Sequence, residues 1–307
     1  MDFERVTVTA LREDDVSFPG QTGDNVSATL TSPSDAAPPR PGILFLHWGF
    51  GDRTSFAIEA LALARAGAVA LCIDAPGYGA RKGPRAGARE PAQVRAYAEQ
   101  LLGDLARAVD FSGEQPGVDA TRLGYVGHSL GATIAGAFLA RDPRIKAAVL
   151  MAGTGTLSRL WLQRRDSEGA LSLEDLDSVR CLPKTRASLL FQFADRDAWI
   201  SRADAEAQLT AARDPKQAKW YACDHALDAA ALQDCAHFLA RQLAFEHEPE
   251  PPPGRDAAAR TSSPLPRDRN LHALEPLAEA LPSLRQHRRV TRPRLDGAVA
   301  SPSRPRG

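Results

Sequence analysis

Uninterrupted apolar runs recur along the chain, as expected of strands that are buried on both faces of a sheet. They lie at residues 42–47, 68–73, 145–151 and 187–193. Between and after them, apolar positions recur at helical spacing, which predicts helices over 55–66, 93–111, 202–212 and 228–245. Strands alternating with helices in this way indicate a parallel sheet with helices on both faces.

Further patterns extend this sheet at its ends. Residues 3–12 and 26–32 alternate between apolar and polar side chains, which predicts an antiparallel pair at one edge. A last short strand is expected at 218–222, and the polar, partly helical stretch 154–186 suits a short cap. The predicted fold class is therefore α/β, with a mostly parallel sheet, helices on both faces and a short cap.

A serine stands between one strand and one helix, in the stretch Arg122 to Phe138. Apolar residues lead into the sequence Gly127-His128-Ser129-Leu130-Gly131, and small and apolar residues then continue at helical spacing. Small residues two places before and after the serine let strand and helix approach closely, and the turn projects the hydroxyl at a helix N-terminus. The pattern favours a nucleophile over a glycine-rich turn with an incidental serine.

A serine nucleophile needs a base within hydrogen-bond reach and an anion that holds the base. Among seven histidines, His225 follows the last short strand, where a loop can bring its ring over the sheet edge. Asp195 and Asp197 both follow the strand at 187–193, and both satisfy the chain order Ser, Asp, His. The residues alone leave the choice of aspartate open.

Backbone N–H groups must stabilise the charge that develops on the substrate oxygen. The N–H of Leu130, directly after the serine, is one expected donor. The loop after the strand at 42–47, His47-Trp48-Gly49-Phe50-Gly51-Asp52, is expected to supply the other. The alternative is a glycine-rich loop that only reverses the chain.

Composition separates the C-terminal stretch from the rest of the chain. Residues 247–307 hold 11 of the 23 prolines and 11 arginines but no Phe, Tyr or Trp. Such a stretch cannot bury enough apolar surface to offset its chain entropy. We therefore predict an α/β catalytic domain over residues 1–246 and a disordered tail, rich in Pro and Arg, over 247–307.

Charge and cysteine usage limit the classes of partner and compartment. The formal net charge is zero, so nothing indicates a nucleic-acid or membrane partner. No apolar run is long enough for a transmembrane helix, and the N-terminal residues lack the basic and then apolar order of a signal peptide. The four cysteines show no C-x-x-C spacing, so reduced thiols in a cytoplasmic protein are expected.

Together these motifs resemble the α/β-hydrolases, and within that superfamily the group of dienelactone hydrolases and small serine esterases. The resemblance spans residues 43–245 and rests on His47-Trp48-Gly49, Asp74-Ala75-Pro76-Gly77-Tyr78-Gly79, Gly127-His128-Ser129-Leu130-Gly131, Asp195-Arg196-Asp197 with Trp199-Ile200-Ser201, and Asp224-His225. It implies a catalytic triad of Ser129, Asp197 and His225, because the family's Gly-x-x-Asp-x-x-Val-Pro loop corresponds to residues 194–201.

The sequence also departs from the family's pattern. Trp48 stands where the family usually has glycine, so the resemblance implies an oxyanion hole from Leu130 and either Gly49 or Trp48. Dienelactone hydrolases use a cysteine nucleophile, so Ser129 does not imply their substrate. The stretch after residue 246 has no expected counterpart in the family.

The function implied is that of a serine hydrolase, which cleaves carboxylic esters of small or medium acyl groups through an acyl-enzyme intermediate. The expected partner is a small-molecule ester, with neither metal nor cofactor. Thioesterases, acyltransferases and peptidases would use the same triad, because fold does not fix the substrate. A non-catalytic binding or scaffold protein of the same fold is the alternative from another class. The sequence does not indicate an oligomeric state.

Removal of the tail tests the predicted domain boundary. Truncation after His247 should leave ester hydrolysis and the melting temperature almost unchanged, because the composition of 248–307 supports no packed core. An ester assay and differential scanning calorimetry on the full-length and truncated proteins measure both quantities. Loss of the cooperative melt in the truncated protein would place these residues in the fold.

Overall fold

The computed structural model describes residues 10–35, 39–83, 85, 90–157, 173–245, 247 and 249. The chain divides into two units, residues 1–267 and 268–307, and all described residues belong to the first. Almost all of the predicted tail, and residues 158–172 of the predicted cap, therefore lie outside the described residues.

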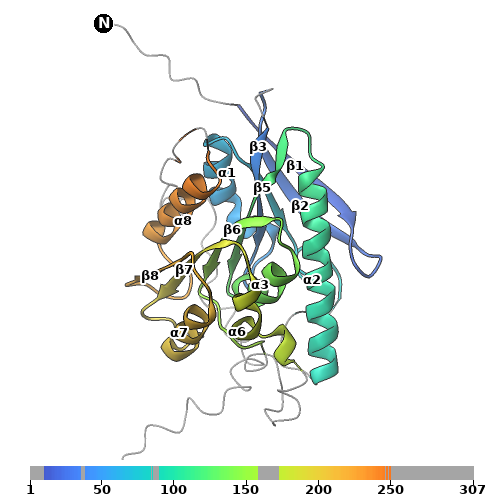
Figure 1. The fold of residues 1–307 in the computed structure, drawn as a ribbon. Coiled ribbons are helices and arrows are strands. Elements are labelled where there is room, and N and C mark those ends of the chain that lie inside the picture. Colours follow the sequence, from blue (N-terminus) through green and yellow to red (C-terminus); the bar gives the residue numbers. More distant parts are fainter. Residues whose placement is uncertain are drawn as a thin grey trace, which may run out of the picture. The chain divides into compact units, whose positions relative to one another are not determined.

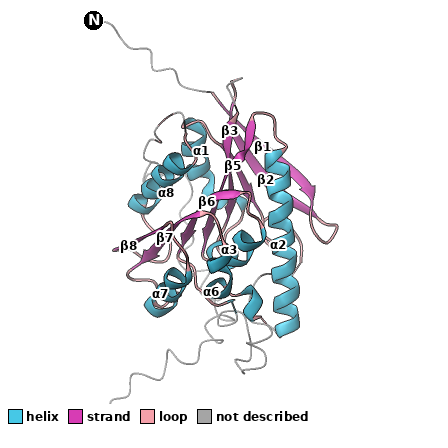
Figure 2. Ribbon diagram, viewed as in Figure 1, coloured by secondary structure: helices cyan, strands magenta, loops and turns pink. Residues whose placement is uncertain are grey.

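An eight-stranded sheet forms the centre of the first unit (Figures 1 and 2). Its strands, in order across the sheet, are β1 (Leu11–Pro19), β2 (Asn25–Pro33), β4 (Val69–Ile73), β3 (Arg40–Leu46), β5 (Val118–His128), β6 (Ile145–Met151), β7 (Ser188–Ala194) and β8 (Lys216–Tyr221). The strands from β4 to β8 in this order are parallel, whereas β2 is antiparallel to both its neighbours. The predicted α/β class with a mostly parallel sheet is confirmed.

Helices cover both faces of the sheet (Figure 1). One face carries α2 (Pro91–Gly113), α3 (Leu130–Arg141), α6 (Ser178–Cys181) and α7 (Arg202–Ala211), and the other carries α1 (Ala57–Arg65) and α8 (Ala229–Gln242). Short 3₁₀ turns are η1 (Arg53–Phe56), η2 (Glu174–Leu176) and η3 (Leu182–Lys184). Successive residues of β3 serve the two layers in turn, because Leu44 packs in the core with α2 and α3, and Phe45 in the core with α1 and α8.

The first strand differs from the prediction. The antiparallel edge pair exists, but β1 runs over Leu11–Pro19 rather than 3–12, and residues 1–9 lie outside the described part. Four charged residues, Arg12 to Asp15, follow Leu11 within the strand. At a sheet edge these charges face solvent and pair locally, as in the ion pair between Arg12 and Asp14 at 2.5 Å. The strand is fixed at its other end by Phe18, which stacks on Phe111 of α2.

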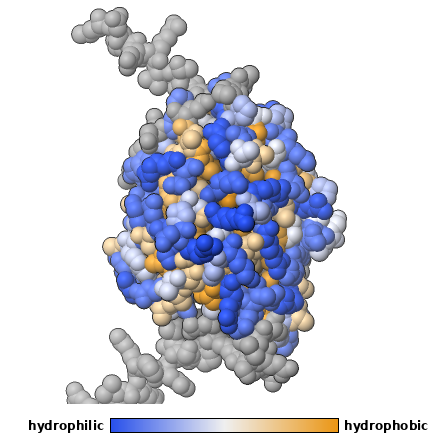
Figure 3. All heavy atoms as spheres, in the orientation of Figure 1, coloured by the Kyte–Doolittle hydropathy of each residue, from blue (hydrophilic) through white to orange (hydrophobic). Residues whose placement is uncertain are grey.

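The cysteines, the helices and the described surface show no further feature that points to a function. All four cysteines are buried and free. Within the described residues, every helix is too short or too polar to cross a membrane. The face in Figure 3 shows mostly hydrophilic side chains, with apolar residues in small patches between them.

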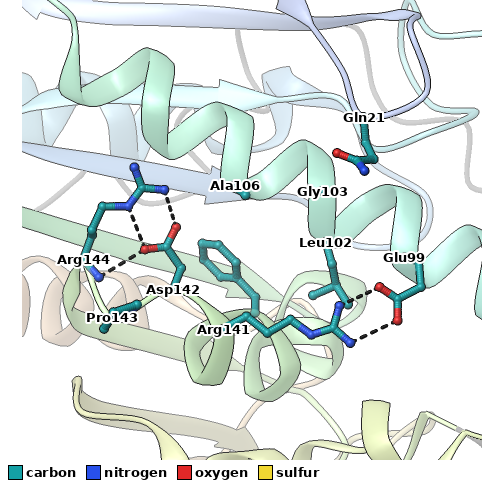
Figure 4. Close-up of a pocket in the computed structure, with 10 residues that line it drawn as sticks. Gln21, Glu99, Leu102, Gly103, Ala106, Arg141, Asp142, Pro143 and Arg144 are labelled. Carbon is teal, nitrogen blue, oxygen red and sulfur yellow. Dashed lines mark hydrogen bonds and ion pairs between the residues drawn. The ribbon is translucent and has the colours of Figure 1, made fainter.

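A groove of about 530 Å³ lies between α2 and the C-terminal end of α3 (Figure 4). Its two arginines are already bound, Arg141 to Glu99 at 2.6 and 3.0 Å and Arg144 to Asp142 at 2.6 and 2.9 Å. None of the predicted site residues lines it. It lies at the opposite end of α3 from Ser129, and is therefore separate from the predicted site residues.

Candidate active site

Ser129 occupies the turn between β5 and α3 in a strained backbone conformation. Its φ is 52° and its ψ is −97°, which residues other than glycine rarely adopt. A Cβ on Gly127 would lie 2.5 Å from the carbonyl carbon of Gly131, and a Cβ on Gly131 would lie 2.3 Å from the carbonyl oxygen of Leu46. Both positions therefore require glycine, which is the steric cause expected from the sequence.

Hydrogen bonds hold this turn against its strain. The N–H of Ser129 donates to the carbonyl of Met151 at 2.8 Å. The carbonyl of Ser129 accepts from the N–H and the hydroxyl of Thr133, both at 2.8 Å. The serine is half-buried, directly before the first residue of α3. Its hydroxyl and the N–H of Leu130 are thus placed at a helix N-terminus, where developing negative charge is favoured.

Asp197 and His225 form a hydrogen-bonded pair on the loops after β7 and β8. Nδ1 of His225 lies 2.7 Å from Oδ2 of Asp197. Because a carboxylate only accepts, Nδ1 carries the proton and Nε2 is the acceptor nitrogen of the neutral ring. The other carboxylate oxygen accepts the N–H groups of Trp199 at 2.8 Å and Ile200 at 3.0 Å. This is the tautomer that a serine-activating base requires.

The surroundings keep Asp197 charged. Its side chain is only 4% exposed, and burial alone would raise its pKa. The hydrogen bond and charge of His225, with the two backbone N–H donors, outweigh burial and hold the pKa of Asp197 below its usual value. A carboxylate in this state can stabilise a charged imidazole beside it.

Asp195, the other candidate acid, has a different environment. Its side chain is 44% exposed and lies 3.6 Å from Arg202. Its backbone N–H donates to the carbonyl of Tyr221, which joins the loop to β8. Asp197 is therefore the aspartate that contacts the predicted base. Asp195 instead stabilises the turn through its backbone hydrogen bond to Tyr221.

His128 joins Ser129 to the loop that carries His225. Nε2 of His128 lies 2.8 Å from the carbonyl oxygen of His225, and the two ring centroids are 5.2 Å apart. The residue before the serine therefore touches the residue predicted to be its base. Among the described residues, no hydrogen bond joins the Ser129 hydroxyl to the His225 ring. Catalytic hydrogen bonds often tighten only when substrate is bound.

The loop after β3 is oriented by His47, which is buried. Nε2 of His47 accepts the N–H of Ala75 at 3.0 Å, so the proton is on Nδ1, which donates to the carbonyl of Trp48 at 2.6 Å. The N–H of Gly51 also donates to that carbonyl, at 3.1 Å. In a trans peptide the N–H points away from the carbonyl, so the N–H of Gly49 is directed away from His47. The direction of the Gly49 amide is therefore fixed by the contacts of the Trp48 carbonyl.

A buried carboxylate fixes the neighbouring loop after β4. Asp74 accepts the backbone N–H of Arg53 at 2.7 Å, its guanidinium at 2.9 Å and the N–H of Ala80 at 2.9 Å. A Cβ on Gly79 would lie 2.2 Å from Asp74, and Gly79 has a φ of 54°. The Asp-x-Pro-Gly-x-Gly segment of the resemblance therefore serves loop geometry beside the site.

Aromatic side chains gather near the candidate residues. The ring of Trp48 lies 4.9 Å from that of His128, and the ring of Phe50 lies 6.1 Å from that of Trp199. Phe50 is 50% exposed, unusual for so large an apolar side chain. Neither His128 nor this aromatic pair was predicted to contribute to the site. The position of His128 inside the serine motif was the available signal.

A metal site in a protein needs several His, Cys, Asp or Glu side chains close together. Among the described residues, no group of three such side chains is arranged to hold a metal ion. Asp197 and His225 are hydrogen-bonded to each other, and Asp197 also accepts two backbone N–H groups.

The buried state of His47 predicts how stability depends on pH. Burial lowers the pKa of His47, and the carbonyl of Trp48 and the charges of Asp74 and Asp52 only partly oppose it. The unfolded chain takes up a proton as pH falls below about 6.5, whereas the folded protein resists it, so stability present above that pH is lost on acidification. The variant His47→Gln lacks this titrating group, so it should not show this loss of stability on acidification.

Urea unfolding at pH 8 and pH 5.5 measures the effect. The difference in unfolding free energy between wild type and His47→Gln should shrink at the lower pH, by at most about 1.4 kcal/mol per pH unit. His237→Gln, on α8, is the control for removal of one histidine. A constant difference would mean that folding leaves the pKa of His47 unchanged, and a growing one that folding raises it; either outcome contradicts the prediction.

Comparisons with known proteins agree with this architecture. The sequence profile of the Alpha/beta hydrolase family matches residues 43–300. The match includes most of the stretch after residue 246, for which we expected no counterpart. An uncharacterized protein of Mycobacterium tuberculosis is 29% identical over 184 residues, which are 58% of this chain and 59% of that protein. The chain thus spans about 59% of the length of the curated relatives it matches.

Solved structures share the fold at low identity. They include an acetyl xylan esterase from Paenibacillus sp. R4, with a TM-score of 0.66, 21% identity and 79% of this chain and 87% of that one covered. A cold-adapted esterase from an Arctic intertidal metagenomic library has a TM-score of 0.61 and 22% identity, over 78% and 97%. A Klebsiella pneumoniae protein described as a dienelactone hydrolase has a TM-score of 0.60 and 21% identity, over 76% and 99%. From the profile match, the chain belongs to the alpha/beta hydrolase family.

Proposed function

We propose that the protein is a serine hydrolase that cleaves carboxylic esters of small or medium acyl groups. The observation that carries the proposal is the Asp197–His225 hydrogen bond, held beside a strained serine turn at one sheet edge. Ligands of such sheets bind beyond the carboxyl ends of the strands, which is where these residues lie.

In the proposed mechanism, Ser129 attacks the carbonyl carbon of the ester and passes its proton to Nε2 of His225. Asp197 holds the ring through Nδ1 and stabilises the imidazolium that forms. The N–H groups of Leu130 and Gly49 bind the oxyanion. His225 then gives the proton to the leaving alcohol, and the acyl group remains on Ser129. Water, activated by the same base, attacks this acyl-enzyme and releases the acid.

Three features support an enzyme over a scaffold protein. A strained serine backbone costs about 1–3 kcal/mol, which a scaffold has no reason to retain. A buried aspartate beside a histidine costs desolvation free energy, and it is useful where charge develops on the ring. The amide of Gly49 is fixed before any ligand is present, as an oxyanion donor must be.

Esters are proposed ahead of amides and thioesters because of the enzymes whose structures resemble this one. Similar structures include several named esterases, whereas the likeness to a chain from work on two prolyl endopeptidases, with a TM-score of 0.59, covers only 39% of that chain. Small or medium acyl groups are proposed because the segment between β6 and β7 is too short for a large cap.

Removal of the nucleophile tests the reaction directly. Ser129→Ala should lower turnover of nitrophenyl esters by about 10⁴-fold or more, because a triad loses nearly all its function with its nucleophile. The fold should persist, since the glycines and not the serine side chain define the turn. Labelling by a fluorophosphonate should occur on wild type and be absent from the variant.

The base is tested in parallel. His225→Ala should be about as damaging as Ser129→Ala, because triad members act as a unit. His237→Ala, on α8, is the matched control. Near-normal turnover of Ser129→Ala, or a larger loss in His237→Ala than in His225→Ala, would exclude the proposed mechanism.

The two aspartates are compared in a separate experiment. Asp197→Asn should cost far more kcat than Asp195→Asn, because only Asp197 contacts the ring of His225 and an amide cannot stabilise an imidazolium. The loss for Asp197→Asn should be on the order of 10⁴-fold. Rates are measured on variants matched for melting temperature. A reversed ranking would assign the acid to Asp195.

A further inference from the structure

We infer that His128 is a positioning residue for the proposed base: it holds the backbone of His225 and packs between that base and the oxyanion loop. The inference rests on the proposed function. In this role His128 does not contact the reacting atoms. It acts through His225.

The hydrogen bond from His128 has one possible direction. A carbonyl oxygen can only accept, so Nε2 of His128 carries the proton that it donates to His225 at 2.8 Å. His128 is buried, with only 3% of its surface exposed. A buried donor that lost this acceptor would lack water to replace it, so the bond fixes the ring of His128 and the carbonyl of His225 together.

The ring of His128 also packs against two loops. Its centroid lies 5.2 Å from that of His225, at an interplanar angle of 32°, and 4.9 Å from that of Trp48, at 55°. His128 directly precedes Ser129 in the chain. One side chain therefore connects the turn of the nucleophile, the loop of the oxyanion hole and the loop of the base.

The loop of His225 is anchored at its two ends by another residue. Nε2 of Gln192 donates to the hydroxyl of Tyr221 at 2.8 Å and to the carbonyl of Ala231 at 2.6 Å. Asp228 caps α8 through the N–H of Ala231 at 3.0 Å. Closer to His225, the N–H of Arg196 donates to the carbonyl of Cys223 at 3.1 Å, and the N–H of Leu227 donates to the carbonyl of Asp224 at 2.9 Å. These bonds shape the loop but do not reach His225 itself.

Two contacts then hold the base itself. Asp197 holds the ring of His225 through Nδ1, and His128 holds its main chain through the carbonyl. Of these two, only the bond from His128 ties His225 to the residue next to Ser129, so it bears directly on the distance between base and nucleophile. A displacement of about 1 Å in such a site costs on the order of 10²-fold in rate.

Three substitutions separate the hydrogen bond from the packing. His128→Gln keeps an N–H donor, since the amide nitrogen of glutamine is as many bonds from Cα as Nε2 of histidine, and it removes the ring. His128→Phe keeps a ring and removes the donor, and His128→Leu removes both. We expect kcat to fall about 10–100-fold in His128→Leu and in His128→Phe, with KM nearly unchanged, and to recover in His128→Gln.

A second readout does not depend on turnover. In protein labelled with ¹⁵N-histidine, the downfield proton signal of the Nδ1–H that His225 shares with Asp197 reports how the base is held. This signal should broaden in His128→Leu and sharpen again in His128→Gln. The pH profile of kcat/KM should shift in His128→Leu for the same reason, whereas a purely structural loss would lower the rate at all pH values alike.

The outcomes distinguish this inference from the proposed function. If wild type neither hydrolyses esters nor reacts with a fluorophosphonate, the proposed function fails. If wild type is active and folded His128→Leu keeps its kcat, its pH profile and its Nδ1–H signal, the positioning role of His128 is wrong. Full recovery in His128→Phe but not in His128→Gln would also overturn it, because packing alone would then suffice.

Discussion

The close approach of β5 and α3 at Ser129 is the constraint on which the candidate site depends. Gly127 and Gly131 leave no space for a side chain, and the serine between them takes a positive φ. That conformation costs about 1–3 kcal/mol. The three hydrogen bonds from the serine backbone, each worth about 0.5–1.5 kcal/mol net, are of the size needed to offset it. The turn is thus stable only within this sheet.

Two buried groups beside the turn take opposite charge states, for reasons visible in their contacts. Asp197 accepts two backbone N–H groups and the Nδ1–H of His225, so its pKa is low despite burial. His47 donates to one carbonyl and accepts one N–H, which a neutral ring satisfies, so burial dominates and its pKa is low too. A charged carboxylate is thereby available to His225, the proposed base, and a neutral His47 orients the proposed oxyanion loop without adding a charge.

Sequence predicted what depends on local pattern and missed what depends on contacts across the fold. The run 145–151 is β6 to the residue, because a strand buried on both faces leaves a continuous apolar signal. The start of the chain misled, because charges are tolerated on the edge strand β1. Asp195 and Asp197 share a loop, and only the direction of each side chain separates them. The bond from His128 to His225 joins residues 97 positions apart, which no local pattern could reveal.

Strain in the described backbone is concentrated where the chemistry is proposed. Four residues other than glycine have a positive φ there, and three of them, Ser129, Ala152 and Leu227, follow β5, β6 and β8 at one sheet edge. Ala152 donates to the carbonyl of Gln192, and Leu227 lies two residues after His225. Each residue with a positive φ lowers the stability of the fold, and packing of the hydrophobic core does not require this conformation. Their clustering with a buried Asp–His pair is what a fold shaped for a reaction requires, because rigid, costly geometry persists where it is used.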